Sequence, residues 1–357
     1  MKEYTPCVNL RVGTGKFIHG TGALQALSGE IKCLGGRPLL IGGPTTTELV
    51  LREVRQQFTE AGIQPLVLVH TGACSRRWAE YYSNVAAEKN CSVIVGIGGG
   101  KCLDLAKCVA TFANMDLITV PTSVATCVAS SAVCFMYLDD GRPDGSVQMH
   151  KEVDVCIADT QLIAGAPKRT LAAGILDSIA KLPEVVHNLT IDTYRDCLLE
   201  KYICTVNSNA IYAFLMGEGA NAYENGMESG RMSDIITTNL LHTSVVSGFS
   251  CGVDQLALAH GLYDCVRRSF TQEARHMLHG EIVAVGVLMQ MRFNGTEDDC
   301  REVRELMRRM HMPMCLSDLG IAPTEENLQI LMDYLIPATA LTDEDRPRLA
   351  EALAAIA

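Results

Sequence analysis

The sequence has no run of basic residues, no closely spaced cysteine pair and no long hydrophobic run. Of its 357 residues, 41 are acidic and 30 are basic, which gives a formal net charge of -11. A chain of this charge repels a phosphate backbone and an anionic membrane surface. We therefore expect neither nucleic acid nor a membrane as a partner.

The 15 cysteines are scattered along the chain without a CxxC pair. In a chain of this length, that pattern is typical of reduced thiols in a cytoplasmic protein and not of a disulfide framework. The N-terminal stretch MKEYTPCVNLRVGTG has no apolar core of signal-peptide length, and no apolar run approaches the roughly 18 residues of a membrane span. The sequence therefore predicts a cytoplasmic protein.

Two halves of the chain differ in their hydrophobic pattern. In the first half, short β-rich runs alternate with helix-length segments; the runs are PLLIGG (38–43), PLVLVHTG (65–72), SVIVGIGG (92–99), LITVPTS (117–123), VCFMYLDD (133–140) and VDVCIADT (153–160). Such alternation predicts parallel strands in a doubly wound sheet. After 166–170, apolar residues recur at spacings of three and four, which predicts helices. We expect an α/β domain over residues 1–163 and an all-helical domain over 164–357.

A glycine-rich segment, VGIGGGKCLDLAK, lies at residues 95–107. Gly98, Gly99 and Gly100 follow a predicted strand and precede a helical pattern. Glycines let the backbone approach a ligand closely, and the free N–H groups of a helix start favour a phosphate. The spacing differs from the GxGxxG fingerprint, so a strand-to-helix turn without a ligand is the alternative interpretation.

The helical half carries ionisable residues in apolar surroundings. They are Asp177 in AAGILDSIAKL, His260 in DQLALAHGLYD, and His276 with His279 in ARHMLHGEIVAVG. One carboxylate and two neutral imidazoles with open coordination positions make a catalytic divalent-metal site, usually for zinc or iron. The alternative is a set of hydrogen-bonded polar groups at helix boundaries. Asp177 can pair with Lys181 at i+4, and His276 can lie in solvent beside Arg275.

Eight segments in the same order give the chain a resemblance to a known family. They are GTGALQAL (20–27), TGACS (71–75), GIGGGKCLDLAK (96–107), VPTSVATC (120–127), MYLDDG (136–141), AGILDSIAK (173–181), LAHGLYD (258–264) and LHGEIVAVG (278–286). The chain resembles the iron-containing (group III) alcohol dehydrogenases, in the branch of glycerol dehydrogenase and hydroxycarboxylate dehydrogenase. The resemblance covers most of the chain. It implies a dehydroquinate synthase-like fold: a Rossmann-like N-terminal domain, an all-helical C-terminal domain and a cleft between them.

The resemblance also implies roles for individual residues. The turn at Gly98, Gly99, Gly100 and Lys101 would hold the pyrophosphate of NAD or NADP, with Asp104 beside it. The residues that would line the cofactor further along the chain are Thr122, Thr126, Ser131 and Val133. The residues at the three metal-ligand positions are Asp177, His260 and His279. Relatives assemble as dimers or octamers, so the resemblance implies a homo-oligomer.

Such a site transfers a hydride between the nicotinamide and a small substrate. A divalent cation, zinc or iron, polarises the substrate carbonyl, and the hydride passes between that carbon and C4 of the nicotinamide. A proton must also move. Tyr263, one turn after His260, is a candidate for that relay, and a core aromatic is its alternative interpretation.

Cys127 departs from the pattern of glycerol dehydrogenases. Those enzymes carry an aspartate there that reaches the substrate, whereas the hydroxycarboxylate dehydrogenase branch has cysteine. Loss of the carboxylate removes a hydrogen-bond acceptor for a polyol and a charge that repels an acid. We therefore expect a small 2-hydroxy or 2-oxo acid as substrate, with glycerol or another polyol as the alternative. Cys127 can also simply fill space.

Two further departures concern the helix of Asp177 and the choice of cofactor. Pro183 stands where an aromatic residue is usual, and it predicts a kink because it removes the hydrogen bond to the Ile179 carbonyl. IGGPTTT (41–47) offers no acid for a ribose 2′-OH and no base for a 2′-phosphate, so both NAD and NADP stay open. A pseudoenzyme that only binds nucleotide is less favoured, since all three ligand positions are filled. A lyase of the dehydroquinate synthase type is less favoured because the motifs resemble those of glycerol dehydrogenase.

Overall fold

The N-terminal part of the protein is a parallel sheet, as the alternating pattern predicts. The computed structural model describes residues 10–187, 191–250 and 257–357. Six parallel strands lie in the order β1-β8-β5-β4-β2-β3. Their bounds are β1 Thr14–Gly20, β2 Pro38–Gly42, β3 Leu66–Val69, β4 Val93–Gly98, β5 Asp116–Pro121 and β8 Val153–Asp159.

Helices cover both faces of this sheet. Alternate residues of a strand point to opposite faces, and here Leu39 and Ile41 lie in one buried cluster while Leu40 lies in another. The first cluster includes α3 (Arg76–Glu88) and α4 (Gly100–Ala113), and the second includes α1 (Leu27–Cys33) and α2 (Pro44–Ala61). Strands buried on both faces are continuous apolar runs, which is why the sequence shows them clearly.

The segment 133–140 was expected to form another strand of the main sheet, and that expectation is wrong. Its strand, β6 (Val133–Tyr137), instead pairs antiparallel with β7 (Pro143–Gln148) in a separate two-stranded sheet. A tight turn joins them, with Gly141 at φ 90° and the Leu138 amide donating to the Arg142 carbonyl at 2.9 Å. A short turn of this kind returns the chain antiparallel, whereas parallel pairing needs a long crossover.

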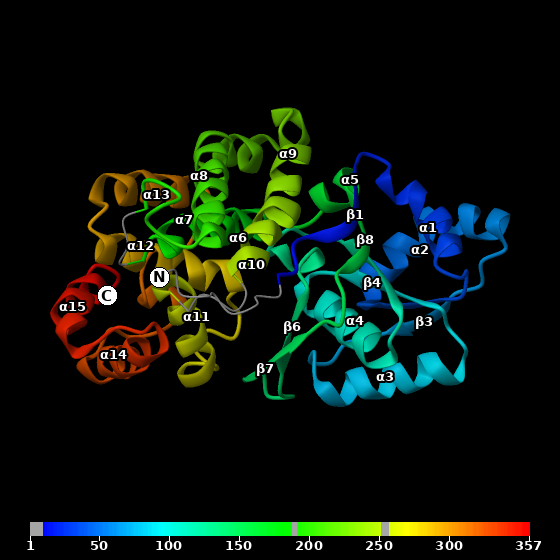
Figure 1. The fold of residues 1–357 in the computed structure, drawn as a ribbon, viewed down its shortest axis with the longest axis horizontal. Coiled ribbons are helices and arrows are strands. Elements are labelled where there is room, and N and C mark those ends of the chain that lie inside the picture. The colour runs from blue at the N-terminus through cyan, green and yellow to red at the C-terminus, as the bar shows by residue number, and fades with distance from the viewer. Residues whose placement is uncertain (1–9, 188–190, 251–256) are drawn as a thin grey trace.

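The part of the chain after β8 is helical over the described residues, which confirms the predicted fold class. Figure 1 shows most of these helices gathered on one side of the molecule and the large sheet on the other, with α5 (Thr160–Ala164) beside β1 and β8. The helices are α5 Thr160–Ala164, α6 Lys168–Ile179, α7 Lys181–Val185, α8 Leu199–Asn225, α9 Met232–Thr237, α10 Thr243–Ser250, α11 Leu258–Ser269, α12 His279–Asn294, α13 Glu297–Arg309, α14 Glu325–Ala338 and α15 Arg346–Ala354. The predicted boundary at residues 163 and 164 falls within α5.

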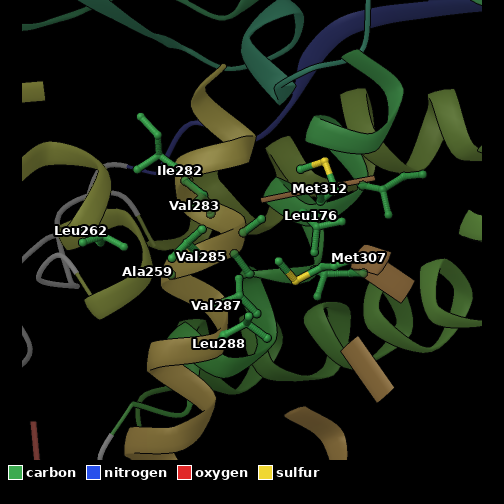
Figure 2. Packing of buried hydrophobic residues seen from close by; sticks show 14 of the residues in the cluster. Leu176, Ala259, Leu262, Ile282, Val283, Val285, Val287, Leu288, Met307 and Met312 are labelled. Carbon is green, nitrogen blue, oxygen red and sulfur yellow. The ribbon is translucent and has the colours of Figure 1, made fainter. Parts of the chain in front are cut away.

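The helix α12 forms the centre of the helical part. Almost every side chain between Gly280 and Met291 is buried, as expected of a helix that neighbours surround. Figure 2 shows its aliphatic side chains directed both toward Ala259 and Leu262 of α11 and toward Leu176 of α6. Each fully buried aliphatic side chain contributes about 1.5–3 kcal/mol. The first residue of α12, His279, is therefore held on a rigid support.

No helix within the described ranges combines the length and the apolar character that a membrane span requires.

Candidate metal centre and nucleotide site

The three predicted metal ligands converge from three helices. Asp177 lies in the last turn of α6, His260 in the first turn of α11, and His279 at the start of α12. The Nε2 atoms of His260 and His279 each lie 3.2 Å from Asp177 Oδ1. One ligand atom from each residue lies within 4.8 Å of the others, and no other such group of three occurs among the described residues. The geometry suits one divalent cation.

Close packing of α6 on α12 brings two of these ligands together. A Cβ atom at Gly280 would lie 2.0 Å from the Ala173 carbonyl oxygen, so only glycine permits this approach. The buried Glu281 carboxylate accepts from the Leu278 amide at 2.7 Å and pairs with Arg169 of α6. These contacts hold the start of α12 against Ala173, which lies one helical turn before Asp177 in α6.

Glu184, in α7, is a site residue that the sequence analysis missed. Both of its carboxylate oxygens lie 2.8 Å from His260 Nδ1, and Oε1 also accepts from the His260 amide at 2.8 Å. An imidazole that donates Nδ1–H keeps its Nε2 lone pair for a metal. Glu184 follows Asp177 by seven residues, two helical turns, and that spacing is the signal in the sequence that was not used.

The charges at the centre fit a cation. Burial acts to raise the pKa of Asp177, but His279 and His260 hold it well below its ordinary value. At Glu184, burial likewise acts to raise the pKa, but His260 lowers it below its ordinary value. Burial would lower the pKa of His260, but Glu184 and Asp177 raise it to about 9. Burial lowers the pKa of His279 despite Asp177. A carboxylate with two imidazoles is a donor set that zinc and iron both accept.

The glycine-rich turn between β4 and α4 has the form of a phosphate cradle. Gly98 adopts φ 144°, a value that L side chains rarely adopt. Gly99 caps α4 without a side-chain hydrogen bond, so the first amides of this 14-residue helix face outward. A Cβ atom at Gly100 would lie 3.4 Å from Thr126 Oγ1, and the Thr122 amide donates to the Gly98 carbonyl at 3.0 Å. The cradle fits a pyrophosphate.

The next residues of this region differ in exposure. Lys101 is exposed, and its ammonium lies 6.0 Å from the centroid of the Tyr137 ring. Asp104 is buried and pairs with Lys107 at 2.9 Å. The pairing directs this carboxylate into the protein, and its place beside a pyrophosphate stays a prediction.

Lys107 is a second residue that the sequence analysis missed. Its side chain is fully buried, and its ammonium donates to the carbonyls of Val128 at 3.0 Å, of Ser131 at 3.3 Å and of Val133. Buried charges need such partners, because an unpaired one costs several kcal/mol. Lys107 therefore fixes the segment that carries Ser131 and Val133, two of the predicted cofactor contacts.

Cys127 begins a short 3-10 turn, Cys127–Ala129. Its Sγ lies 3.9 Å from Ser247 Oγ. Burial raises the pKa of the Cys127 thiol, Lys181 acts to lower it, and Asp177 adds to the rise. The raised pKa favours the neutral form of the Cys127 thiol, and the charges of Lys181 and Asp177 both influence this pKa.

Two further candidates from the sequence, Tyr263 and His276, lie in different surroundings. The Tyr263 ring centroid lies 4.1 Å from that of His279, and its hydroxyl lies 3.1 Å from the Tyr137 hydroxyl. Tyr263 thus borders the metal centre. His276 is exposed, and Arg275 Nε lies 2.9 Å from its ring nitrogen, so the solvent interpretation of His276 is the one the structure supports.

Comparison with known proteins agrees with this architecture. A family model described as iron-containing alcohol dehydrogenase matches residues 14–160. A glycerol dehydrogenase of Escherichia coli O6:H1 is 30% identical over 321 residues, 86% of this chain and 83% of the relative. Hydroxycarboxylate dehydrogenase A of Escherichia coli K12 is 27% identical over 256 residues, 70% of this chain and 67% of the relative. The crystal structure of a probable glycerol dehydrogenase from Sinorhizobium meliloti 1021 superposes with a TM-score of 0.80 at 23% identity, over 98% of each chain.

The sequence match, the shared fold and the enzymes among its relatives establish what kind of protein this is. The chain belongs to the iron-containing alcohol dehydrogenases, a family of metal-containing, NAD(P)-dependent oxidoreductases that act on CH–OH groups.

Proposed function

We propose that this enzyme interconverts a small 2-hydroxy acid and the corresponding 2-oxo acid, with NAD or NADP as hydride carrier. The observation that carries the proposal is the residue type at position 127, a cysteine whose Sγ lies 3.9 Å from Ser247 Oγ. Burial, with a contribution from the Asp177 charge, raises the pKa of this thiol and so favours its neutral form. An aspartate at this position would place a second negative charge at the substrate and repel an acid. A thiol leaves room for a carboxylate and offers a polyol no strong acceptor.

The residues of the site divide the work of the reaction. Asp177, His260 and His279 would hold a divalent cation, which when bound supplies the positive charge that polarises the substrate carbonyl. Glu184 keeps the proton of His260 on Nδ1 and so leaves Nε2 for the ion.

Other groups bind the cofactor and move the proton. The cradle at Gly98–Gly100 holds the pyrophosphate, so that the nicotinamide can reach a substrate carbon at about 3–3.5 Å. We assign the proton relay to the Tyr263 hydroxyl, because it bonds the Tyr137 hydroxyl at 3.1 Å and its ring borders His279.

The test is a substrate panel with metal-reconstituted enzyme, in which oxidation of NADH and NADPH is followed with 2-oxobutyrate, 2-oxoglutarate and dihydroxyacetone. We expect a 2-oxo acid to give the largest kcat/KM. Cys127→Asp should reduce activity on the acid and Cys127→Ser, a neutral control, should retain most of it. Dihydroxyacetone as the best substrate of the wild type would contradict the proposal.

Glycerol or another polyol is the second candidate substrate. It is favoured by the relatives named glycerol dehydrogenase, which match most of the chain. A wild type that prefers dihydroxyacetone, together with a Cys127→Ser variant of unchanged activity, would support this candidate and reduce Cys127 to a packing residue.

A further inference from the structure

Lys181 lies on the same helical face as two residues of the metal centre. It begins α7, one residue after Ala180, where α6 has ended, and the kink expected from Pro183 stays a prediction. The backbone stays helical across the interruption, since Ala180 has φ -53° and ψ -28° and the Glu184 amide donates to the Ala180 carbonyl at 3.1 Å. Asp177, Lys181 and Glu184 are therefore at positions i, i+4 and i+7, which share one face of a helix.

Asp177 and Glu184, which precede and follow Lys181 on this helical face, both contact the imidazole of His260. Asp177 Oδ1 lies 3.2 Å from His260 Nε2, and Glu184 lies 2.8 Å from His260 Nδ1. Lys181 lies between these two residues in the sequence and on the same helical face, so the face that carries it is the one that bears the metal-centre residues. Lys181 is partly exposed, unlike the buried Asp177, and a ligand can therefore reach it.

The charge of Lys181 acts on the whole centre. It lowers the pKa values of Cys127, Asp177 and Glu184, although burial is the largest influence on each.

We propose that the Lys181 ammonium binds the carboxylate of the substrate and thereby sets the preference for an anionic over a neutral substrate. The inference rests on the proposed function, which it deepens. In a 2-oxo acid the carboxylate is bonded directly to the carbonyl carbon. A substrate whose carbonyl lies at the three metal ligands therefore presents its negative charge within the same small site. An ammonium has three N–H donors, so a substrate carboxylate adds to the interactions that Lys181 makes within the protein.

The test compares an acid with a neutral ketone of the same carbon chain in one variant. Lys181→Met removes the charge at nearly constant length, and Lys181→Arg keeps the charge as a matched control. For Lys181→Met we expect kcat/KM for 2-oxobutyrate to fall about 10- to 100-fold, mainly through KM, because a hydrogen bond to a charged group is lost. 1-Hydroxy-2-butanone has no carboxylate, so its kcat/KM measures what the lost charge does to the rest of the centre. We therefore expect the ratio of acid to ketone kcat/KM to fall about 10- to 100-fold in Lys181→Met and to stay near the wild-type value in Lys181→Arg.

The neutral ketone also reports on folding, because a damaged site would lose both activities. If Lys181→Met is not folded, Lys181→Gln answers the same question. An unchanged ratio of acid to ketone activity in a folded, charge-free variant would overturn the role of Lys181, while the proposed function would stand if the wild type uses the acid.

If the wild type uses no acid as substrate, inhibition by a carboxylate can still test whether Lys181 binds a carboxylate, separately from the proposed function. Oxamate has the carboxylate of a 2-oxo acid but accepts no hydride, and oxamide is its neutral control. If the wild type reduces only dihydroxyacetone, the proposed function is wrong. Competitive inhibition by oxamate that Lys181→Met loses would then still support carboxylate binding by Lys181. Equal inhibition of both proteins would overturn it.

Discussion

The Glu184 carboxylate decides which nitrogen of His260 carries the proton, since it lies 2.8 Å from Nδ1. Glu184→Gln keeps the shape of the side chain and removes its charge. Loss of such a partner typically weakens metal binding about 10- to 100-fold. We expect that increase in the dissociation constant for Zn²⁺, measured by competition with a chelator. Glu297→Gln, at an exposed pair with Arg292, is the control and should bind Zn²⁺ as the wild type does. Equal affinity of all three proteins would rule out this role for Glu184.

Protonation of His260 sets the pH dependence of metal binding. Burial is outweighed by Glu184 and Asp177, which raise the pKa of His260 to about 9 in the metal-free protein. Below that pH the imidazole is protonated and cannot bind a cation, so binding must release a proton. We expect the apparent affinity for Zn²⁺ to rise up to about tenfold per pH unit between about pH 6 and about pH 8. Calorimetric titration in buffers of different ionisation enthalpy measures the released proton; a pH-independent affinity would contradict this expectation.

Secondary structure elements differ in how much of their placement the sequence reveals. The strands β2, β4 and β8 are buried on both faces and are therefore visible as apolar runs. β1, at the edge of the sheet, has the mixed sequence TGKFIHG and was missed. The pattern of β6 shows a strand but not its partner, which a turn decides.

The same limit applies to the site. Asp177, His260 and His279 were found from residue type and family resemblance. Glu184 and Lys107 each had a local signal, the spacing of Glu184 from Asp177 and of Lys107 from Asp104, but the contacts that give them their roles are not local. His260 lies 76 residues from Glu184, and the carbonyls that Lys107 binds lie 21 to 26 residues away.

Lys107 couples α4 to the segment that should line the cofactor. Lys107→Met leaves the buried Asp104 unpaired, which costs about 3–5 kcal/mol of stability, whereas Asp104→Asn with Lys107→Met removes both charges and costs less. Both variants lose the bonds to Val128, Ser131 and Val133. We expect the double variant to stay folded and to bind NADH or NADPH about tenfold more weakly in a fluorescence titration.

The control for this variant is Lys151→Met, because Lys151 pairs with Asp116 and Asp154 and contacts no predicted cofactor residue. It should lower the melting temperature without changing nucleotide affinity. Wild-type affinity in the double variant would show that Lys107 serves stability alone.

At the scale of the whole molecule, a bound cation would cross-link α6 to α11 and α12, two consecutive helices that lie much later in the sequence. The ligands come from α6, α11 and α12, and α12 is the centre of the helical core. Anything that binds only the folded state stabilises it by mass action, about 2.7 kcal/mol at a free concentration of about 100 times the dissociation constant. We expect Zn²⁺ at that excess to raise the melting temperature by several degrees, and a chelator to reverse the change.

Variants of two neighbouring histidines separate specific binding from a general effect of the ion. His279→Ala removes a ligand and should abolish the increase in melting temperature, because two remaining donors hold the ion far more weakly. His276→Ala removes an exposed histidine three residues earlier and should leave the increase intact. Calorimetric scans of the three proteins with and without Zn²⁺ provide the comparison. An increase that persists in His279→Ala would mean that the ion stabilises the fold from another place, and the three-helix cross-link would be wrong.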